Sequence, residues 1–134
     1  MKKIYRITKN QLDEITKAAT SSATRGGREI CGLLMDNGYF IELIRAKNMI
    51  RKGGGFQFNS TEIRTIQTAA KQLNHKIIGT FHSHPAYLAV PSDSDIRCTL
   101  DDSLMLIIDV LGKKAALWHI KDKKKRKVRF GLKN

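Results

Sequence analysis

Apolar residues recur at helical spacing in two stretches of the chain. In residues 9–23 the apolar positions are Leu12, Ile15, Ala18 and Ala19. After a helix cap at Asn59 or Ser60, the second stretch carries Ile63, Ile66, Ala70 and Leu73. Side chains three and four positions apart lie on one face of a helix, so both stretches are predicted to be helices that bury one face.

Short apolar and β-branched runs between and after these helices predict β-strands. They lie at residues 4–7, 31–35, 39–46, 56–58, 76–81, 104–110, 115–120 and 127–130. Asp36-Asn37-Gly38 separates two of these runs, and Asn-Gly is a strong signal for a hairpin turn. This mixed order of elements predicts an α+β fold, with a mixed β-sheet flanked by helices in a single domain over residues 1–134.

Two histidines stand one residue apart directly after the apolar run at residues 76–81. His82 and His84 share a face if the strand continues through them, because strand side chains alternate. Pro85 then ends the strand, and a loop carries Asp95 back toward the histidines. Two imidazoles and one carboxylate leave one position of a tetrahedral zinc site for water. The pattern therefore favours a hydrolytic metalloenzyme.

Ser92 and Asp95 also fit a structural role at the start of a short helix. Ser92 is a good N-cap for a helix over residues 92–100, and an acid three residues later approximates a capping box. The two interpretations are compatible if the helix start presents Asp95 to a metal. From the residues alone, Asp93 is an alternative third ligand.

The local spacing of four residues resembles the JAMM signature of the MPN-domain metallopeptidases: His82, His84, Ser92 and Asp95. That family adds an upstream glutamate followed by an apolar strand with a glycine, and the segment beginning Glu29-Ile30-Cys31-Gly32 is similar to it. Without the downstream motif, this glutamate would be interpreted as a solvated charge at the edge of a strand. The resemblance covers most of the chain. It implies the curved mixed sheet of the cytidine-deaminase-like JAMM/MPN fold, in a small prokaryotic form.

The resemblance also implies a role for each of these residues. His82, His84 and Asp95 would be the ligands of one zinc ion per chain. Glu29 would be the general base on the attacking water and then the proton donor to the leaving amine, while Ser92 would donate a hydrogen bond to the oxyanion. The implied activity is that of an isopeptidase or peptidase. It would cleave after the C-terminal tail of a ubiquitin-like or sulfur-carrier protein.

Charge is the feature that this hypothesis does not explain. The chain has a formal net charge of +13, and residues 121–129 hold seven Lys or Arg against one Asp. Such a balance is typical of proteins with an acidic partner, either an acidic protein surface or a nucleic acid. No aromatic residue interrupts residues 121–129, so base stacking is not indicated there. The alternative is a solvated hairpin between two terminal strands.

Three other functions deserve comparison with the peptidase. A non-catalytic MPN scaffold would resemble the family with ligands lost, whereas all five positions are filled here. A nucleic-acid-associated protein like the RadC family would suit the basic surface, but its usual His-Asn-His-Pro motif is absent. A zinc nucleobase deaminase is disfavoured because its His-x-Glu and Pro-Cys-x-x-Cys pattern is missing.

The two cysteines and the N-terminus bear on the compartment. Cys31 and Cys98 have no CxxC spacing, and both are expected to be buried core thiols. The chain starts with basic residues but has no apolar core of signal-peptide length, and nothing approaches a transmembrane span. We therefore expect a cytoplasmic protein without a membrane partner.

Overall fold

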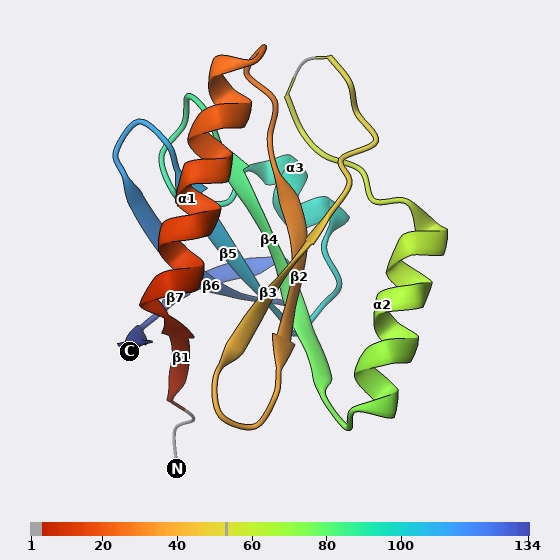
Figure 1. The fold of residues 1–134 in the computed structure, drawn as a ribbon. Helices are drawn as coiled ribbons and strands as arrows, with labels where there is room; N and C mark the ends of the chain where they lie inside the picture. Colours follow the sequence, from red (N-terminus) through yellow and green to blue (C-terminus); the bar gives the residue numbers. More distant parts are fainter. Residues whose placement is uncertain (1–3, 53) are drawn as a thin grey trace.

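The computed structural model describes residues 4–52 and 54–134, and Figure 1 shows its elements. The helices are α1 (Lys9–Thr24), α2 (Ser60–Gln72) and α3 (Asp93–Cys98). The strands are β1 (Tyr5–Thr8), β2 (Cys31–Asp36), β3 (Ile41–Ala46), β4 (Lys76–His84), β5 (Ser103–Asp109), β6 (Lys114–Lys121), β7 (Lys124–Val128) and β8 (Phe130–Lys133).

All of these strands belong to one mixed sheet, in the order β7-β6-β5-β4-β2-β3-β1-β8. β4 pairs with β5, and β1 with both β3 and β8, in parallel, whereas the other neighbours are antiparallel. The two edge strands, β7 and β8, are consecutive in the chain and only Arg129 separates them. The sheet must therefore curl strongly to bring its opposite edges together, and the predicted α+β fold with a curved mixed sheet is confirmed.

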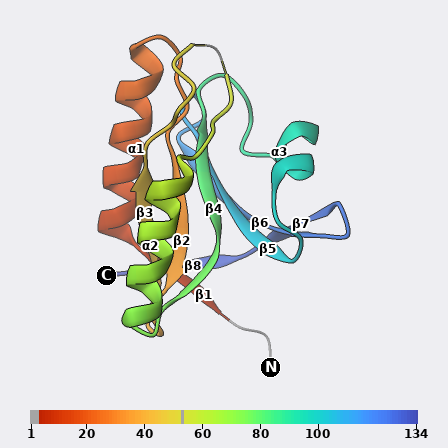
Figure 2. The ribbon, with the colours of Figure 1, turned by 90° about the vertical axis from the view of Figure 1, so that its right-hand side faces the viewer.

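The helices lie on both sides of the sheet. Figure 2 shows α1 and α2 on one side and α3 on the other. The larger core joins α1, through Ile15 and Ala19, to buried strand residues such as Phe81 and Leu106. A smaller apolar cluster lies beneath α3 on the opposite face, formed by Met105, Ile107 and Ile120 with Ala89, Ile96 and Trp118 packed against it. The sheet therefore separates a structural face from a face that carries α3.

Local capping explains where the helices begin. The side chain of Thr8 accepts a hydrogen bond from the backbone N–H of Gln11 at the start of α1. Asn59 does the same for Glu62 at the start of α2. Such caps satisfy N–H groups that have no partner within the helix.

Two sequence predictions of strands are wrong. Residues 56–58 form no strand, and the backbone carbonyl of Gln57 instead accepts a hydrogen bond from Met49 at 2.8 Å. The predicted strand at residues 127–130 is split at Arg129, because the residues before it pair with β6 and those after it pair with β1. Gly53, in the predicted glycine-rich loop, lies outside the described residues.

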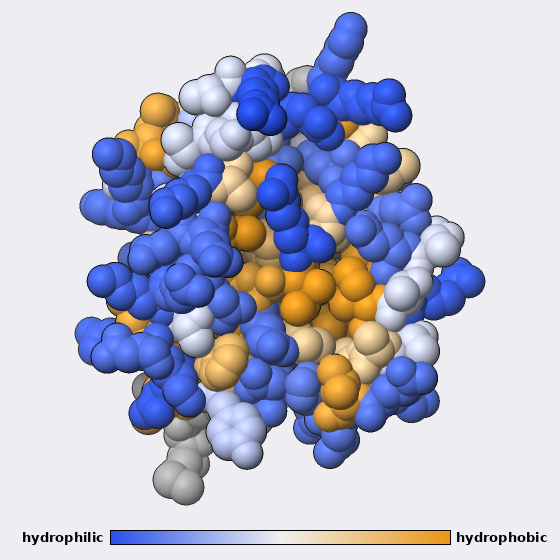
Figure 3. All heavy atoms as spheres, viewed as in Figure 1, coloured by the Kyte–Doolittle hydropathy of each residue, from blue (hydrophilic) through white to orange (hydrophobic). Residues whose placement is uncertain are grey.

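Figure 3 shows one face of the molecule, where apolar side chains are visible between α1 and α2 and polar side chains surround them. Among the described residues, no helix is long and apolar enough to cross a membrane.

The pairing of β4 with β5 leaves no space for a side chain at Gly79. A Cβ at this position would overlap the backbone carbonyl of Leu104 in the neighbouring strand. We expect Gly79→Ala to lower the free energy of unfolding by about 3 kcal/mol or more, because the clash is with backbone and not with a movable side chain. Urea unfolding followed by Trp118 fluorescence measures this change.

Gly131→Ala is the matched control, since a Cβ there would meet only Arg6 Cγ at 4.0 Å. It should change the free energy of unfolding by less than about 0.5 kcal/mol. Equal stability losses in the two variants would contradict the close approach of β4 to β5.

Candidate metal centre

The pairing of β2 with β4 brings three polar residues to one face of the sheet. Cys31 is the antiparallel partner of His82, so Glu29, two residues earlier, lies on the same face as His82 and His84. All three residues are buried, with exposed fractions of 8%, 0% and 5%. Each offers a ligand atom within 4.8 Å of the others, and the group can therefore hold a metal ion.

Asp95 completes a tighter cluster with the two histidines. Nε2 of His82 lies 3.0 Å from Nε2 of His84, and Oδ2 of Asp95 lies 3.1 and 3.2 Å from these two atoms. Zinc–ligand bonds of about 2.0–2.1 Å at tetrahedral angles place neighbouring ligand atoms about 3.3 Å apart. The three atoms thus have nearly the separation that one shared zinc ion requires. Glu29 lies beside this triangle.

The second ring nitrogen has a hydrogen-bond partner in His84, whereas that of His82 is buried without one among the described residues. Nδ1 of His84 lies 2.7 Å from the carbonyl oxygen of Leu88, which can only accept, so Nδ1 carries the proton. In the neutral ring, Nε2 is then free to bind a metal. The ring of His82 instead packs against Phe56, with 4.8 Å between the ring centroids. Both imidazoles are therefore oriented by contacts outside the cluster.

The pKa shifts in the cluster follow from the contacts between Asp95 and the two histidines. Burial would raise the pKa of Asp95, but hydrogen bonds with His82 and His84 hold it well below its usual range. Burial would likewise lower the pKa of His84, yet its contacts with Asp95 and with the Leu88 carbonyl raise it above the ordinary value. The carboxylate is therefore ionised at neutral pH, as metal coordination requires.

The start of α3 positions both Ser92 and Asp95. The hydroxyl of Ser92 accepts a hydrogen bond from the N–H of Asp95 at 3.0 Å, and Oδ2 of Asp95 accepts one from the N–H of Ser92 at 2.9 Å. This is the predicted capping box, and the same Oδ2 contacts the histidines. The structural interpretation of Asp95 is thus confirmed, and the same carboxylate also contacts both histidines. Asp93, the alternative ligand, is exposed in the first turn of α3.

Glu29 is fixed by a loop that follows β3. Its Oε2 accepts a hydrogen bond from the N–H of Gly55 at 2.6 Å. Gly55 has a φ of +88°, a conformation that favours glycine, which explains why glycine suits this position. The backbone at Gly54 and Gly55 therefore reaches the site.

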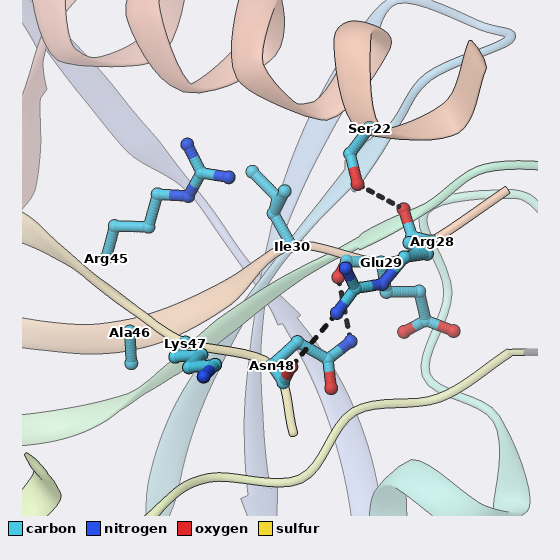
Figure 4. Close-up of a pocket in the computed structure, with 8 residues that line it drawn as sticks. All are labelled: Ser22, Arg28, Glu29, Ile30, Arg45, Ala46, Lys47 and Asn48. Atoms are coloured by element: carbon cyan, nitrogen blue, oxygen red, sulfur yellow. Dashed lines mark hydrogen bonds between the residues drawn. The ribbon is translucent and has the colours of Figure 1, made fainter. Parts of the chain in front are cut away.

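Asn48 connects this loop to the strand that carries Glu29. Its Nδ2 donates to the carbonyl oxygens of Glu29 at 2.9 Å and Gly55 at 3.1 Å, and its Oδ1 accepts from the N–H groups of Ile50 and Gln57. Arg28 adds two hydrogen bonds, to the carbonyl oxygens of Asn48 and Ile50. Figure 4 shows Asn48 and Arg28 together beside a pocket of about 380 Å³.

Sequence reasoning identified the five residues of the motif but missed those that hold them: Asn48, Gly55, Phe56 and Leu88. No local pattern singled out Asn48 or Leu88. Asn48 acts through backbone groups as far away in the chain as Glu29, and Leu88 acts through its backbone carbonyl, which contacts the ring of His84. Ser83, predicted to point away from the ligands, does so, and its hydroxyl accepts from the N–H of Ile30 at 2.9 Å. Cys31 is buried, and burial raises the pKa of its thiol to about 12. Cys98 is exposed, so its prediction as a core thiol is wrong.

The protein thus combines a curled mixed sheet with a cluster of two histidines and one aspartate, which lies between the end of β4 and the start of α3. Residues 10–125 match the family model of the prokaryotic homologues of the JAB domain. The chain belongs to this family, and the resemblance inferred from the motif is confirmed. No curated protein sequence matches the chain.

Solved structures agree with this assignment. A solution structure of a protein from Desulfitobacterium hafniense is 26% identical, with a TM-score of 0.80, and the match covers 97% of this chain and 93% of that one. A JAB1/MPN domain protein from Archaeoglobus fulgidus is 18% identical, with a TM-score of 0.61 and coverage of 97% and 100%. A structure described as a metalloprotease-like zinc site in the proteasome and signalosome is 17% identical, with a TM-score of 0.60 and coverage of 98% and 100%.

The hydrogen bonds of Asn48 give a test of the loop's attachment. In Asn48→Ala, the buried carbonyl of Glu29 loses a donor, and the loop loses three more bonds. We expect the free energy of unfolding to fall by about 2–4 kcal/mol, because unsatisfied buried polar groups are costly. Chemical denaturation followed by circular dichroism measures the loss.

Asn10→Ala, at an exposed position of α1, serves as the control and should change the stability by less than about 0.5 kcal/mol. A loss below about 1 kcal/mol in Asn48→Ala would show that the loop does not depend on this side chain.

Proposed function

We propose that this protein is a zinc-dependent metallopeptidase of the isopeptidase type. The observation that carries the proposal is the convergence of His82 Nε2, His84 Nε2 and Asp95 Oδ2 within 3.0–3.2 Å of one another, with Glu29 buried beside them. These three atoms would hold the zinc ion. A bound zinc ion supplies a Lewis acid and lowers the pKa of a water in its open position to roughly 7.

Glu29 is proposed as the general base and later the general acid. Ligand atoms of Glu29, His82 and His84 lie within 4.8 Å of one another, so Glu29 is near enough to reach a shared metal. We assign it proton exchange with water because Asp95 Oδ2 already lies 3.1 and 3.2 Å from Nε2 of the two histidines. Gly55 holds Oε2 through a hydrogen bond, which leaves Oε1 for the transferred proton. The same carboxyl group would then protonate the leaving amine.

Ser92 is proposed to stabilise the oxyanion. Its hydroxyl oxygen is occupied as an acceptor by the N–H of Asp95, whereas its proton remains available to donate. The side chain is exposed at the start of α3, where a substrate can reach it. One such donor aimed at the developing charge contributes about 3 kcal/mol to transition-state stabilisation.

The proposed substrate is the amide bond that follows the C-terminal tail of a ubiquitin-like or sulfur-carrier protein, with a Gly-Gly tail by family analogy. Membership of the prokaryotic JAB family supports this class, as does the fold shared with a structure described as a metalloprotease-like zinc site. The cytoplasm is the proposed compartment. A role as a non-catalytic scaffold is disfavoured because ligands, base and hydroxyl all lie at one site.

The ligand set has a direct test in metal stoichiometry. We expect native mass spectrometry to find one zinc per chain in the wild-type protein and none in Asp95→Ala or His82→Ala, because two remaining ligands hold zinc poorly. Asp93→Ala is the matched control, since it removes an acid two residues away that does not contact the histidines. Zinc loss in Asp93→Ala with retention in Asp95→Ala would reverse the ligand assignment.

The role of Glu29 is tested by Glu29→Gln, which keeps an oxygen for the hydrogen bond from Gly55 but cannot take up a proton. We expect full zinc content and a cleavage rate at least about 100-fold lower, as for loss of a general base. The assay uses a sulfur-carrier protein whose Gly-Gly tail is fused to a fluorescent reporter. Glu14→Gln, at an exposed position of α1, is the control. Wild-type cleavage by Glu29→Gln would refute the assigned role.

A further inference from the structure

The basic run at residues 121–129 forms the hairpin of β6 and β7, at one edge of the sheet. Its turn residues are Asp122 and Lys123, with φ values of +54° and +61°. The hairpin is tied to the segment around α3: Asp122 N–H donates to the Asp101 carboxylate at 2.6 Å, and Lys123 Nζ lies 3.4 Å from the carbonyl oxygen of Arg97. The position of the charges is therefore fixed relative to the helix that carries Asp95.

Several features of this hairpin disfavour folding. Lys121 is the direct cross-strand partner of Lys124, and like charges in that arrangement are destabilising. Lys123 adopts a left-handed conformation that glycine or asparagine adopts at lower cost. At the Lys121–Lys124 pair, positive charge thus occupies positions where it weakens the fold. A role in binding an anionic partner accounts for this arrangement.

The register of β7 separates its cationic side chains between the two faces of the sheet. Lys127 pairs with Trp118 and Lys125 with Ile120. Both partners belong to the apolar cluster beneath α3, and Trp118 Nε1 donates a hydrogen bond to the carbonyl of Ala89, in the loop after His84. Cross-strand partners share a face, so Lys125 and Lys127 project on the α3 side.

The metal ligands lie on that same face. His82 pairs with Ile107, another member of the cluster beneath α3, and its side chain is therefore on the α3 side of the sheet. Lys124 and Arg126, which alternate with the first pair, project on the opposite face, where Arg126 pairs with His119. One strand thus presents two cations toward the side of the candidate site and two away from it.

We propose that Lys125 and Lys127 form a docking surface for an acidic face of the substrate protein, on the face of the sheet that also carries the metal centre. This inference rests on the proposed function. The supporting observations are the shared face with His82, the exposed positions of both lysines and the net charge of +13. Nucleic acid is the competing partner, but no aromatic side chain lies between residues 121 and 129 to stack on bases.

The test compares two double variants that remove equal charge from the same strand. The zinc-loaded full-length protein, K125Q/K127Q and K124Q/R126Q are titrated with an acidic sulfur-carrier protein that ends in Gly-Gly, and binding is measured by calorimetry. We expect K125Q/K127Q to bind about 10-fold more weakly or worse, and K124Q/R126Q to change the Kd by less than about 3-fold. Circular dichroism verifies that both variants fold.

Two parallel titrations sharpen the result. A carrier variant with its acidic side chains changed to Asn and Gln should lose the difference between the two double variants. A duplex DNA of 12 base pairs should bind more weakly than the acidic carrier at equal salt concentration.

Three results would overturn the proposal. The first is equal weakening of carrier binding in both double variants, since the face of the sheet that carries His82 would then contribute no more to binding than the opposite face. The second is a larger loss in K124Q/R126Q, which would place binding on the opposite face of β7, where Arg126 pairs with His119. The third is tighter binding of the DNA than of the carrier.

Because the readout is binding and not cleavage, an inactive protein with face-selective carrier binding would refute the proposed peptidase activity but not the docking surface. Efficient cleavage with no difference between the variants would refute the docking surface alone.

Discussion

The antiparallel pairing of β2 with β4 determines where every buried polar group of the site lies. The pairing extends past the strand ends through two hydrogen bonds between Ile30 and Ser83, one from each N–H. Ile30 and Ser83 are 53 residues apart in the chain, and their pairing aligns Glu29 with the histidines. A slip of one residue would turn either Glu29 or His82 to the opposite face, because strand side chains alternate.

Burying several imidazole and carboxylate groups together lowers the stability of the folded protein, and hydrogen bonds from the surrounding residues offset part of this loss. A buried imidazole or carboxylate without partners is unfavourable, and here two imidazoles and two carboxylates are partly or fully buried together. The capping box, the Leu88 carbonyl and the Gly55 N–H each satisfy one of these groups. Within the site, hydrogen bonds with the two histidines account for the low pKa of Asp95, and Nδ1 of His82 is the buried atom left without a hydrogen-bond partner among the described residues.

Local spacing predicted much of the fold and the pairing of His82 and His84 with Asp95, and the family resemblance added Glu29, whereas contacts between distant residues were not predicted. Strand alternation places His82 and His84 on one face, and the cap pattern at Ser92 marks a real helix start. Asn48 was not predicted because its partners are backbone groups that only the folded loop brings close. The split at Arg129 was missed for a related reason. The apolar pattern continues through it, but the curled sheet sends the two halves to opposite edges.

The most direct test of the central claim is a crystal structure of the zinc-loaded protein with anomalous diffraction measured at the zinc absorption edge. The account predicts one anomalous peak about 2.0–2.1 Å from His82 Nε2, His84 Nε2 and Asp95 Oδ2, with Glu29 beyond bonding distance. A peak bonded to Glu29 in place of Asp95 would contradict it, because Glu29 would then be a ligand and not the base. The absence of any peak at this cluster would contradict the metal centre itself.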